Sequence, residues 1–217
     1  MSESTIVLQE MDTEKKIVVL SLNRPKQLNA LNDMMLYELH DKLDALSKEQ
    51  LDALVMNSQI DRAFCTGIDV HAVQSMTNHE AARFFANIAG VLEKLSTFSC
   101  PTVAVVNGYA FGAGADLALA CDIRLGGHSS TFRFPGPQFG VVLGTHRLVN
   151  EVGASLARKI ALTNELIHSD KALQYGMIHK AVDEHEALDE GILLAKKLSR
   201  VPVHTFKSIQ DICAGPI

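Results

Sequence analysis

Apolar positions along the chain follow two periods, one typical of strands and one typical of helices. Alternating or near-continuous apolar segments with β-branched residues predict strands. These segments span residues 5–10, 16–22, 53–57, 102–106, 122–125, 130–134 and 178–182. The first two are expected to form a hairpin that turns at Asp12-Thr13. A continuous apolar run such as 102–106 is typical of a strand buried on both faces of an α/β sheet.

Apolar residues at helical spacing predict helices between and after these strands. Thr77 and Glu80 form a capping-box pattern, and Asn32 or Asp33 caps an earlier helix. The predicted helices span 32–46, 77–97, 112–120, 145–152, 154–162, 169–175, 186–199 and 204–212. Residues 58–69 are predicted to form a polar, glycine-containing loop. Because strands and helices alternate early and helices dominate late, the order predicts an α/β fold with a helical C-terminal region.

Composition places the chain among globular proteins and disfavours two classes of partner. The 217 residues are 47% hydrophobic and 21% charged, enough to bury a core without disulfides or metal. A net charge of −5 makes nucleic acid or an anionic membrane an unexpected partner. The N-terminus lacks the pattern of a secretory signal. The longest apolar stretch, 103–121, is interrupted by Asn107, Asp116 and glycines, so no membrane span is predicted.

The four cysteines do not indicate a metal or redox centre. Cys65, Cys100, Cys121 and Cys213 form no C-x-x-C pair. Cys100 and Cys121 lie in apolar stretches and are interpreted as small buried hydrophobic residues. We therefore expect no metal site, and a reduced, cytoplasmic setting.

Two glycine-containing segments carry the candidate chemistry. Residues 62–70 follow a strand, and residues 106–116 follow a buried strand and open a helix. A glycine-rich turn into a helix leaves backbone N–H groups unpaired, and these can hold an anion or a developing oxyanion. The Gly112-Ala113-Gly114 turn lacks the third glycine of the dinucleotide-binding motif. On these residues alone, the turn could equally serve close packing.

Several ordered stretches together carry a family resemblance. They are LNRP at 22–25 with NALN at 29–32, AFCTGID at 63–69, PTVAVVNGYAFGAG at 101–114, and ACDI at 120–123. They resemble the N-terminal signature and the two oxyanion loops of the crotonase (enoyl-CoA hydratase/isomerase) superfamily. The similarity extends from Ile17 to about Lys207, which is most of the chain.

The resemblance implies a crotonase-like fold of repeated strand–strand–helix (ββα) units with a helical C-terminal region. We expect residues 1–200 to form the core domain and 201–217 a truncated helical region, because family members are usually longer. The implied substrate is an acyl-CoA or a carrier-protein thioester, as in fatty acid metabolism. Coenzyme A is then part of the substrate and no separate cofactor is expected. Homotrimers or hexamers are the implied assemblies.

The resemblance also assigns candidate site residues by motif position. The N–H groups of Ile68 and Ala113 would hold the thioester oxygen as it becomes an enolate or tetrahedral oxyanion. The positions that match the family's CoA contacts are Lys26, Leu28, Ala30, Ala63, Gly67, Ile68, Asp69 and Val70. Lys26 would meet a CoA phosphate or stay a solvated lysine. Asp69 would contact CoA or serve as a turn or cap residue.

The chain departs from the family's hydratase pattern at the carboxylates. Hydratase members have two glutamates; the first position is Asp116 here and the second is Gly136. Asp116 would act as a base or be a plain acid at a helix start. His146 and Gln138 are candidates to replace the missing group, since histidine titrates near neutral pH. A surface histidine is the alternative for His146.

Three functions are compatible with these residues. The leading hypothesis is an enzyme of the enoyl-CoA hydratase/isomerase type that stabilises an enolate or oxyanion through two backbone N–H groups. Hydration needs both a base and an acid within reach, and Gly136 does not supply the second group. A decarboxylase or hydrolase of a CoA or carrier-protein thioester is therefore the first alternative. A non-catalytic CoA-binding homologue is the second.

Overall fold

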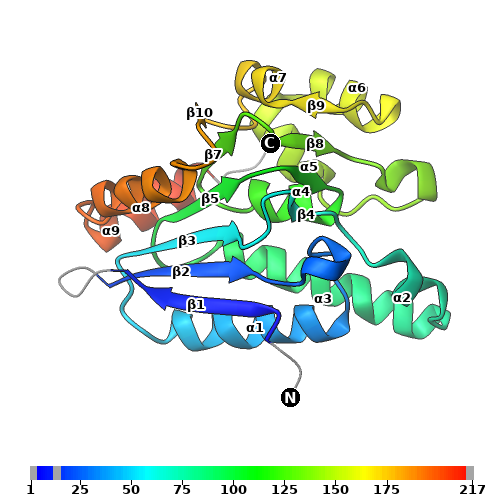
Figure 1. Ribbon diagram of the computed structural model, residues 1–217, viewed down its shortest axis with the longest axis horizontal. Helices are drawn as coiled ribbons and strands as arrows, with labels where there is room; N and C mark the ends of the chain where they lie inside the picture. The colour runs from blue at the N-terminus through cyan, green and yellow to red at the C-terminus, as the bar shows by residue number, and fades with distance from the viewer. Residues whose placement is uncertain (1–3, 12–15, 214–217) are drawn as a thin grey trace.

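A six-stranded sheet and a smaller four-stranded sheet form the centre of the molecule (Figure 1). The structure is a computed structural model that describes residues 4–11 and 16–213, so the predicted turn at Asp12-Thr13 lies outside the described residues. The large sheet has the order β1-β2-β3-β5-β7-β10, with β1 antiparallel to β2 and the other pairs parallel. Its strands are β1 (Ile6–Glu10), β2 (Ile17–Leu22), β3 (Ala53–Ser58), β5 (Thr102–Val106), β7 (Ile123–Gly127) and β10 (Lys180–Val182).

The small sheet repeats the order of the large one. Its strands, in the order β4-β6-β8-β9, are β4 (Ala63–Cys65), β6 (Tyr109–Phe111), β8 (Thr131–Arg133) and β9 (Ile167–His168). Each of β3, β5 and β7 is followed along the chain by one strand of this sheet and then by a helical segment. This confirms the predicted strand–strand–helix repeat and the α/β class.

Helices cover both faces of the large sheet. They are α1 (Asp33–Ser47), α2 (Val70–Gln74), α3 (Asn78–Ser96), α4 (Ala113–Leu119), α5 (Thr145–Val152), α6 (Ala154–Thr163), α7 (Ser169–Gln174), α8 (Ala187–Leu198) and α9 (Val203–Cys213), with 3-10 turns η1 (Pro25–Gln27) and η2 (Gly136–Phe139). Alternate residues of β2 separate two cores: Val18 and Leu20 pack with α1 and α3, whereas Ile17 and Val19 pack with α8. Burial on both faces explains why β2, β3 and β5 read as continuous apolar runs.

The capping box at Thr77 and Glu80 is present at the start of α3, and β5 and α5 have the predicted bounds. Cys100 and Cys121 are buried, as expected. The prediction that 58–69 is a loop throughout is wrong, because β4 lies inside it. β6, β9 and α2 were also not predicted. These segments have two to five residues, too few for a period, and β4, β6 and β9 exist only through pairing with distant strands.

Two glycines allow the segment from β6 to α4 to lie close to the backbone around β4. Gly108, with φ +63°, lies against the carbonyl of Arg62, and Gly114 lies against the carbonyl of Cys65. A side chain at either position would overlap those backbone atoms. The segment around β4 therefore lies directly against the segment from β6 to α4.

The last helix rests on the C-terminal end of α3. In α9, Phe206 is buried and the Gln210 amide donates to the Ser96 carbonyl at 3.0 Å. The division into a 1–200 core and a 201–217 region stays a prediction.

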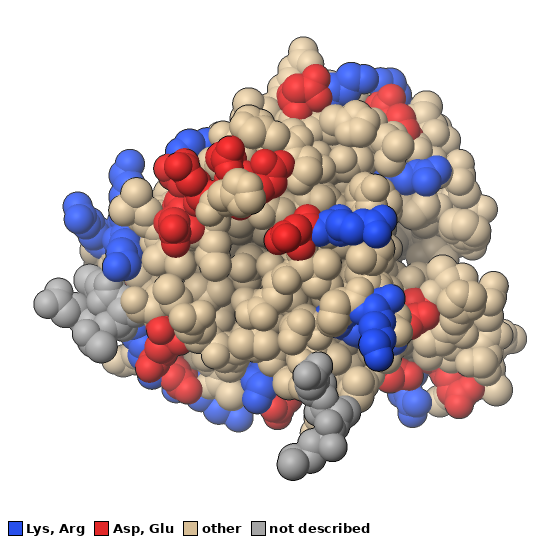
Figure 2. All heavy atoms as spheres, in the orientation of Figure 1, with Lys and Arg blue, Asp and Glu red and all other residues tan. Residues whose placement is uncertain are grey.

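Figure 2 shows basic and acidic side chains interspersed on the face in view, without a broad basic region. In the part of the chain that the structure describes, every helix is too short or too polar to cross a membrane.

The close approach at Gly114 can be tested against a second helical glycine. Alanine normally favours a helix interior over glycine by about 1 kcal/mol. A methyl group at Gly114 would overlap the Cys65 carbonyl, whereas nothing lies within 4 Å of one at Gly90 in α3. We expect Gly114→Ala to lower the free energy of unfolding by at least about 2 kcal/mol and Gly90→Ala to raise it by about 0.5–1 kcal/mol. Urea denaturation measures both, and equal stabilisation by the two changes would contradict the packing.

Candidate active site

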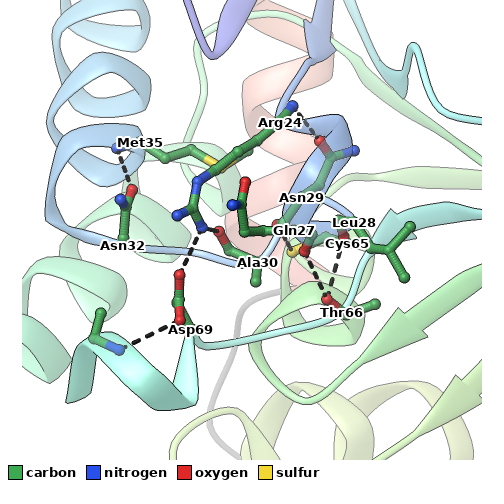
Figure 3. A network of polar contacts seen from close by, with 11 residues as sticks. Arg24, Gln27, Leu28, Asn29, Ala30, Asn32, Met35, Cys65, Thr66 and Asp69 are labelled. Atoms are coloured by element: carbon green, nitrogen blue, oxygen red, sulfur yellow. Dashed lines mark hydrogen bonds and ion pairs between the residues drawn. The ribbon is translucent and has the colours of Figure 1, made fainter. Parts of the chain in front are cut away.

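Asn29 fastens the N-terminal loop to β4. It is fully buried with φ 58°. Its side-chain nitrogen donates to the Phe64 carbonyl at 2.9 Å and to Ser58 Oγ at 2.8 Å, and its side-chain oxygen accepts from the Arg24 N–H at 2.7 Å. Its carbonyl accepts from the Cys65 thiol at 3.0 Å (Figure 3). Burial raises the pKa of this thiol to about 12, so Cys65 acts as a neutral donor.

An ion pair extends the same network to the start of α2. Arg24 Nη1 donates to the Ala30 carbonyl at 2.7 Å and to Asp69 Oδ2 at 2.9 Å (Figure 3). Asp69 Oδ1 accepts from the Ala72 N–H at 3.3 Å and thereby caps α2. Burial raises the pKa of Asp69, but the hydrogen bonds from Arg24 and Ala72 outweigh it and hold the pKa below its usual value. The geometry therefore gives Asp69 a cap and ion-pair role.

Two backbone N–H groups near this network have no partner among the described residues. The Leu31 N–H donates to the Gly67 carbonyl at 2.7 Å, and the Asp69 N–H donates to the Leu31 carbonyl at 2.8 Å. In this parallel pairing the N–H of Ile68 points away from Leu31. Ala113 is the first residue of α4, where N–H groups have no partner within the helix. Among the described residues, neither N–H donates to a protein acceptor.

Gly67 brings these two N–H groups together. It has φ +90°, and a Cβ atom added there would lie 2.6 Å from the Phe111 carbonyl oxygen and 3.6 Å from the Ala113 nitrogen. The first loop thus runs against the second with no side chain between them. Ile68 and Ala113 both border one cavity of about 420 Å³, a size that suits a small ligand.

Asp116 brings a carboxyl group to the same cavity. It lies in the first turn of α4, is 5% exposed, and packs against the Cα atom of Gly144. Within the described residues its Oδ1 atom has no hydrogen-bond partner. Burial raises the pKa of Asp116 to about 7, and the positive charge of Arg147 opposes the rise. A carboxyl group that titrates near neutral pH is suited to proton transfer.

Arg147, whose positive charge acts on this carboxyl group, is held in place by α3. It is 8% exposed, and its Nη2 atom lies 3.3 Å from Ser96 Oγ and 3.5 Å from Glu93 Oε2. A second buried arginine, Arg124, holds the other end of α5 through an ion pair with Glu151. These contacts fix α5, which carries Arg147 and begins beside Gly144.

Gly136 lines the cavity at the start of η2 and offers no room for a side chain. A Cβ atom there would lie 2.6 Å from the Val141 carbonyl oxygen. The Val141 N–H in turn donates to the Gly136 carbonyl at 2.9 Å, which closes a tight turn. The short segment 136–141 therefore occupies the space into which a carboxylate at 136 would extend.

The structure brings together some of the residues that the sequence singled out. Ile68, Ala113, Asp116, Gly67 and Val70 line the cavity. The remaining CoA candidates lie outside its described lining: Lys26 is exposed on η1, Ala63 is buried in β4, and Leu28, Ala30 and Asp69 belong to the network of the N-terminal loop.

The two candidates for the missing carboxylate lie elsewhere. His146 is exposed on α5 and is absent from the described cavity lining, although Thr145 and Leu148 of the same helix line it. The side chain of Gln138 is also exposed and accepts from the Asn164 amide at 2.7 Å. Asp116 therefore stands without a second titratable side chain among the described residues that line the cavity.

Sequence reasoning missed the residues that support the site. Asn29 and Arg24 were recognised as parts of a motif, but neither they nor Arg147 was given a role. The sequence gives little indication of their roles. A buried arginine or asparagine is identified by its hydrogen-bond and ion-pair partners, and these are distant in sequence here. Among the described residues, no group of three or more His, Cys, Asp and Glu side chains lies close enough to hold a metal ion.

Comparisons with known proteins agree with the resemblance. The family model described as enoyl-CoA hydratase/isomerase matches residues 12–215. A crotonyl-CoA hydratase from Syntrophomonas wolfei is 32% identical over 194 residues, which cover 88% of this chain and 74% of that protein. A short-chain-enoyl-CoA hydratase from Clostridium acetobutylicum is 32% identical over 212 residues, which cover 94% and 80% of the two chains.

Solved structures match over nearly the same extent. The crystal structure of an enoyl-CoA hydratase from Bacillus anthracis superposes with a TM-score of 0.89 at 25% identity, covering 95% of this chain and 81% of that one. Pseudomonas aeruginosa DspI superposes with the same TM-score at 26% identity, covering 96% and 79%. Because the family model matches nearly the whole chain, residues 12–215, the chain belongs to the enoyl-CoA hydratase/isomerase family.

Proposed function

We propose that the protein is an acyl-CoA enzyme that moves a proton next to a thioester carbonyl, in the manner of an enoyl-CoA isomerase. The observation that carries the proposal is the cavity bordered by two unpartnered N–H groups, of Ile68 and Ala113, and by the lone carboxyl group of Asp116. A thioester oxygen between the two N–H groups becomes a better electron acceptor. Each such donor typically contributes roughly 2.7–4 kcal/mol to lowering a barrier.

The proton transfer follows from these three groups. The Asp116 carboxylate removes a proton from the carbon next to the thioester carbonyl. The electron pair of that C–H bond moves into the thioester, and the negative charge comes to lie on the oxygen held by Ile68 and Ala113. Protonated Asp116 then returns the same proton to the γ-carbon of a β,γ-unsaturated acyl group, so the double bond moves and no atom is gained or lost.

A single carboxyl group supports isomerisation better than hydration. Hydration needs one group for water and one for the α-carbon, and the position of the second is Gly136.

The CoA part is proposed to lie along the N-terminal loop beside Lys26, Leu28 and Ala30. A trimeric or hexameric assembly remains part of the proposal on family resemblance alone. A cytoplasmic location remains part of it on the pattern of the cysteines. A panel of β,γ- and α,β-unsaturated acyl-CoA thioesters tests the reaction; no turnover and no CoA binding would end the proposal.

The pH dependence of the reaction depends on the ionisation of Asp116. As a base, Asp116 must be ionised, and its pKa is raised to about 7. We expect kcat/KM for isomerisation to rise with pH to a plateau, with its midpoint near pH 7. Asp116→Asn should lower the rate by roughly 10²–10⁴-fold at the plateau, the usual contribution of a general base. A midpoint below pH 5, or an unimpaired Asn variant, would contradict the assignment.

The stability of the same variant serves as its control. Because burial raises the pKa of Asp116 from 3.8 to about 7, the folded wild-type protein loses stability as pH rises from about 4 to about 7, where the unfolded chain ionises this group and the folded protein does not. Asparagine does not ionise. Asp116→Asn should therefore be more stable than wild type at pH 8, by up to about 4 kcal/mol, with the difference fading toward pH 4. Loss of activity in a protein of at least normal stability cannot come from unfolding.

Substitutions at Gly136 test whether the missing carboxylate can be restored. Because a Cβ atom there would press on the Val141 carbonyl, Gly136→Glu should not create a hydratase. We expect no detectable hydration of enoyl-CoA, and a loss of about 1–3 kcal/mol of stability. Gly136→Ala is the matched control, since it adds the same Cβ atom without a carboxylate and should lose a similar amount. A stable Glu variant that hydrates enoyl-CoA would contradict this prediction, because it would show that the turn at 136–141 can rearrange to admit the side chain.

A further inference from the structure

Most side chains that line the cavity, apart from Asp116, are apolar. Helices α2 and α3 contribute Val73 and Phe85, and the segment from η2 to α5 contributes Val141, Leu143 and Leu148. Figure 2 shows the surface hollowed at the right of the view, between α2 below and the segment around η2 above. This part of the cavity can bury methylene and methyl groups, but it provides few partners for polar groups.

Positive charge is missing from this lining. Among the described residues that border the cavity there is no lysine, arginine or histidine. Two arginines on neighbouring segments are engaged elsewhere: Arg24 pairs with Asp69, and Arg147 contacts Ser96 and Glu93. A carboxylate at the far end of an acyl chain would therefore lose its water without gaining a cation, which is costly.

Asp116 adds to that cost. It is the titratable side chain of the described lining, and it carries a negative charge above neutral pH. A second carboxylate in the same cavity would repel it, because like charges in a low-dielectric site disfavour each other's ionised form. The apolar lining and the charge of Asp116 therefore both disfavour the binding of a carboxylate.

We propose that the acyl pocket selects uncharged, apolar acyl groups and rejects acyl groups that end in a carboxylate. This inference rests on the proposed function, since it concerns the acyl end of the same thioester. It also bears on the decarboxylase alternative, because a decarboxylase of malonyl-type thioesters has to hold a carboxylate in this cavity. The selecting feature is the absence of a cation from the described lining beside Val73, Phe85 and Leu143.

A matched pair of unreactive ligands tests the inference. Glutaryl-CoA and 5-methylhexanoyl-CoA have acyl chains with the same number and branching of heavy atoms, but the first ends in a carboxylate and the second in an isopropyl group. Each buried methyl or methylene group is worth about fourfold in affinity. With the repulsion by Asp116 added, calorimetry at pH 8 should show 5-methylhexanoyl-CoA binding at least about thirtyfold more tightly.

The outcomes separate this inference from the proposed function. Equal affinities, or tighter binding of glutaryl-CoA, would overturn the inference and leave the acyl-CoA proposal standing. Binding of neither ligand would overturn the acyl-CoA proposal itself, and the inference with it.

A charge introduced at the cavity edge gives a second test. Gln74 is the last residue of α2, lines the cavity and is exposed, so it can be changed without disturbing the core. Gln74→Arg should reduce the preference for 5-methylhexanoyl-CoA over glutaryl-CoA at least about fivefold, mainly by tightening glutaryl-CoA. Gln74→Met has a side chain of similar length without charge and should leave the preference unchanged or larger. The same ratio in both variants would contradict the electrostatic cause.

Discussion

The contact between two backbone loops is the constraint on which the site depends. Gly67, Gly108 and Gly114 let the segment around β4 lie directly on the segment from β6 to α4. Any side chain at these points would separate the loops. Because Ile68 follows Gly67 and Ala113 precedes Gly114, the same contact sets the two unpartnered N–H groups beside one cavity. The hydrogen bonds of Asn29 and the ion pair of Arg24 hold the first loop in that position.

The second feature is a carboxyl group whose environment opposes its charge. Gly144 allows the helix start of α5 to press against Asp116, which excludes water from the carboxyl group. Arg147 is near enough to moderate the burial effect but is committed to Ser96 and Glu93. The resulting pKa near neutrality is a compromise between burial, which raises the pKa, and the positive charge of Arg147, which lowers it. In the proposed reaction, the Ile68 and Ala113 N–H groups supply the site for negative charge, and Asp116 carries the proton.

Much of the fold followed from the sequence, and part of the site did. Long periodic or continuous segments, such as β5 and α3 with its Thr77–Glu80 cap, were predictable because local residues decide them. The strands β4, β6 and β9 were not, because tertiary pairing decides them. His146 is instructive: its residue type suited proton transfer, but helical geometry turns Thr145 and Leu148 toward the cavity and His146 to solvent. The burial of Arg147 likewise depends on α3, far away in sequence.

The proposed contact of the thioester oxygen with the N–H groups of Ile68 and Ala113 is tested most directly by an infrared measurement. A saturated acyl-CoA with a 13C-labelled thioester carbonyl would be bound to the protein, and its carbonyl stretch compared with that in water. Two N–H donors in a cavity shielded from water polarise the carbonyl more than water does. If Ile68 and Ala113 hold the thioester oxygen, the carbonyl stretching frequency is lower in the bound state than in water. A bound ligand whose carbonyl stretch equals or exceeds its frequency in water would contradict it.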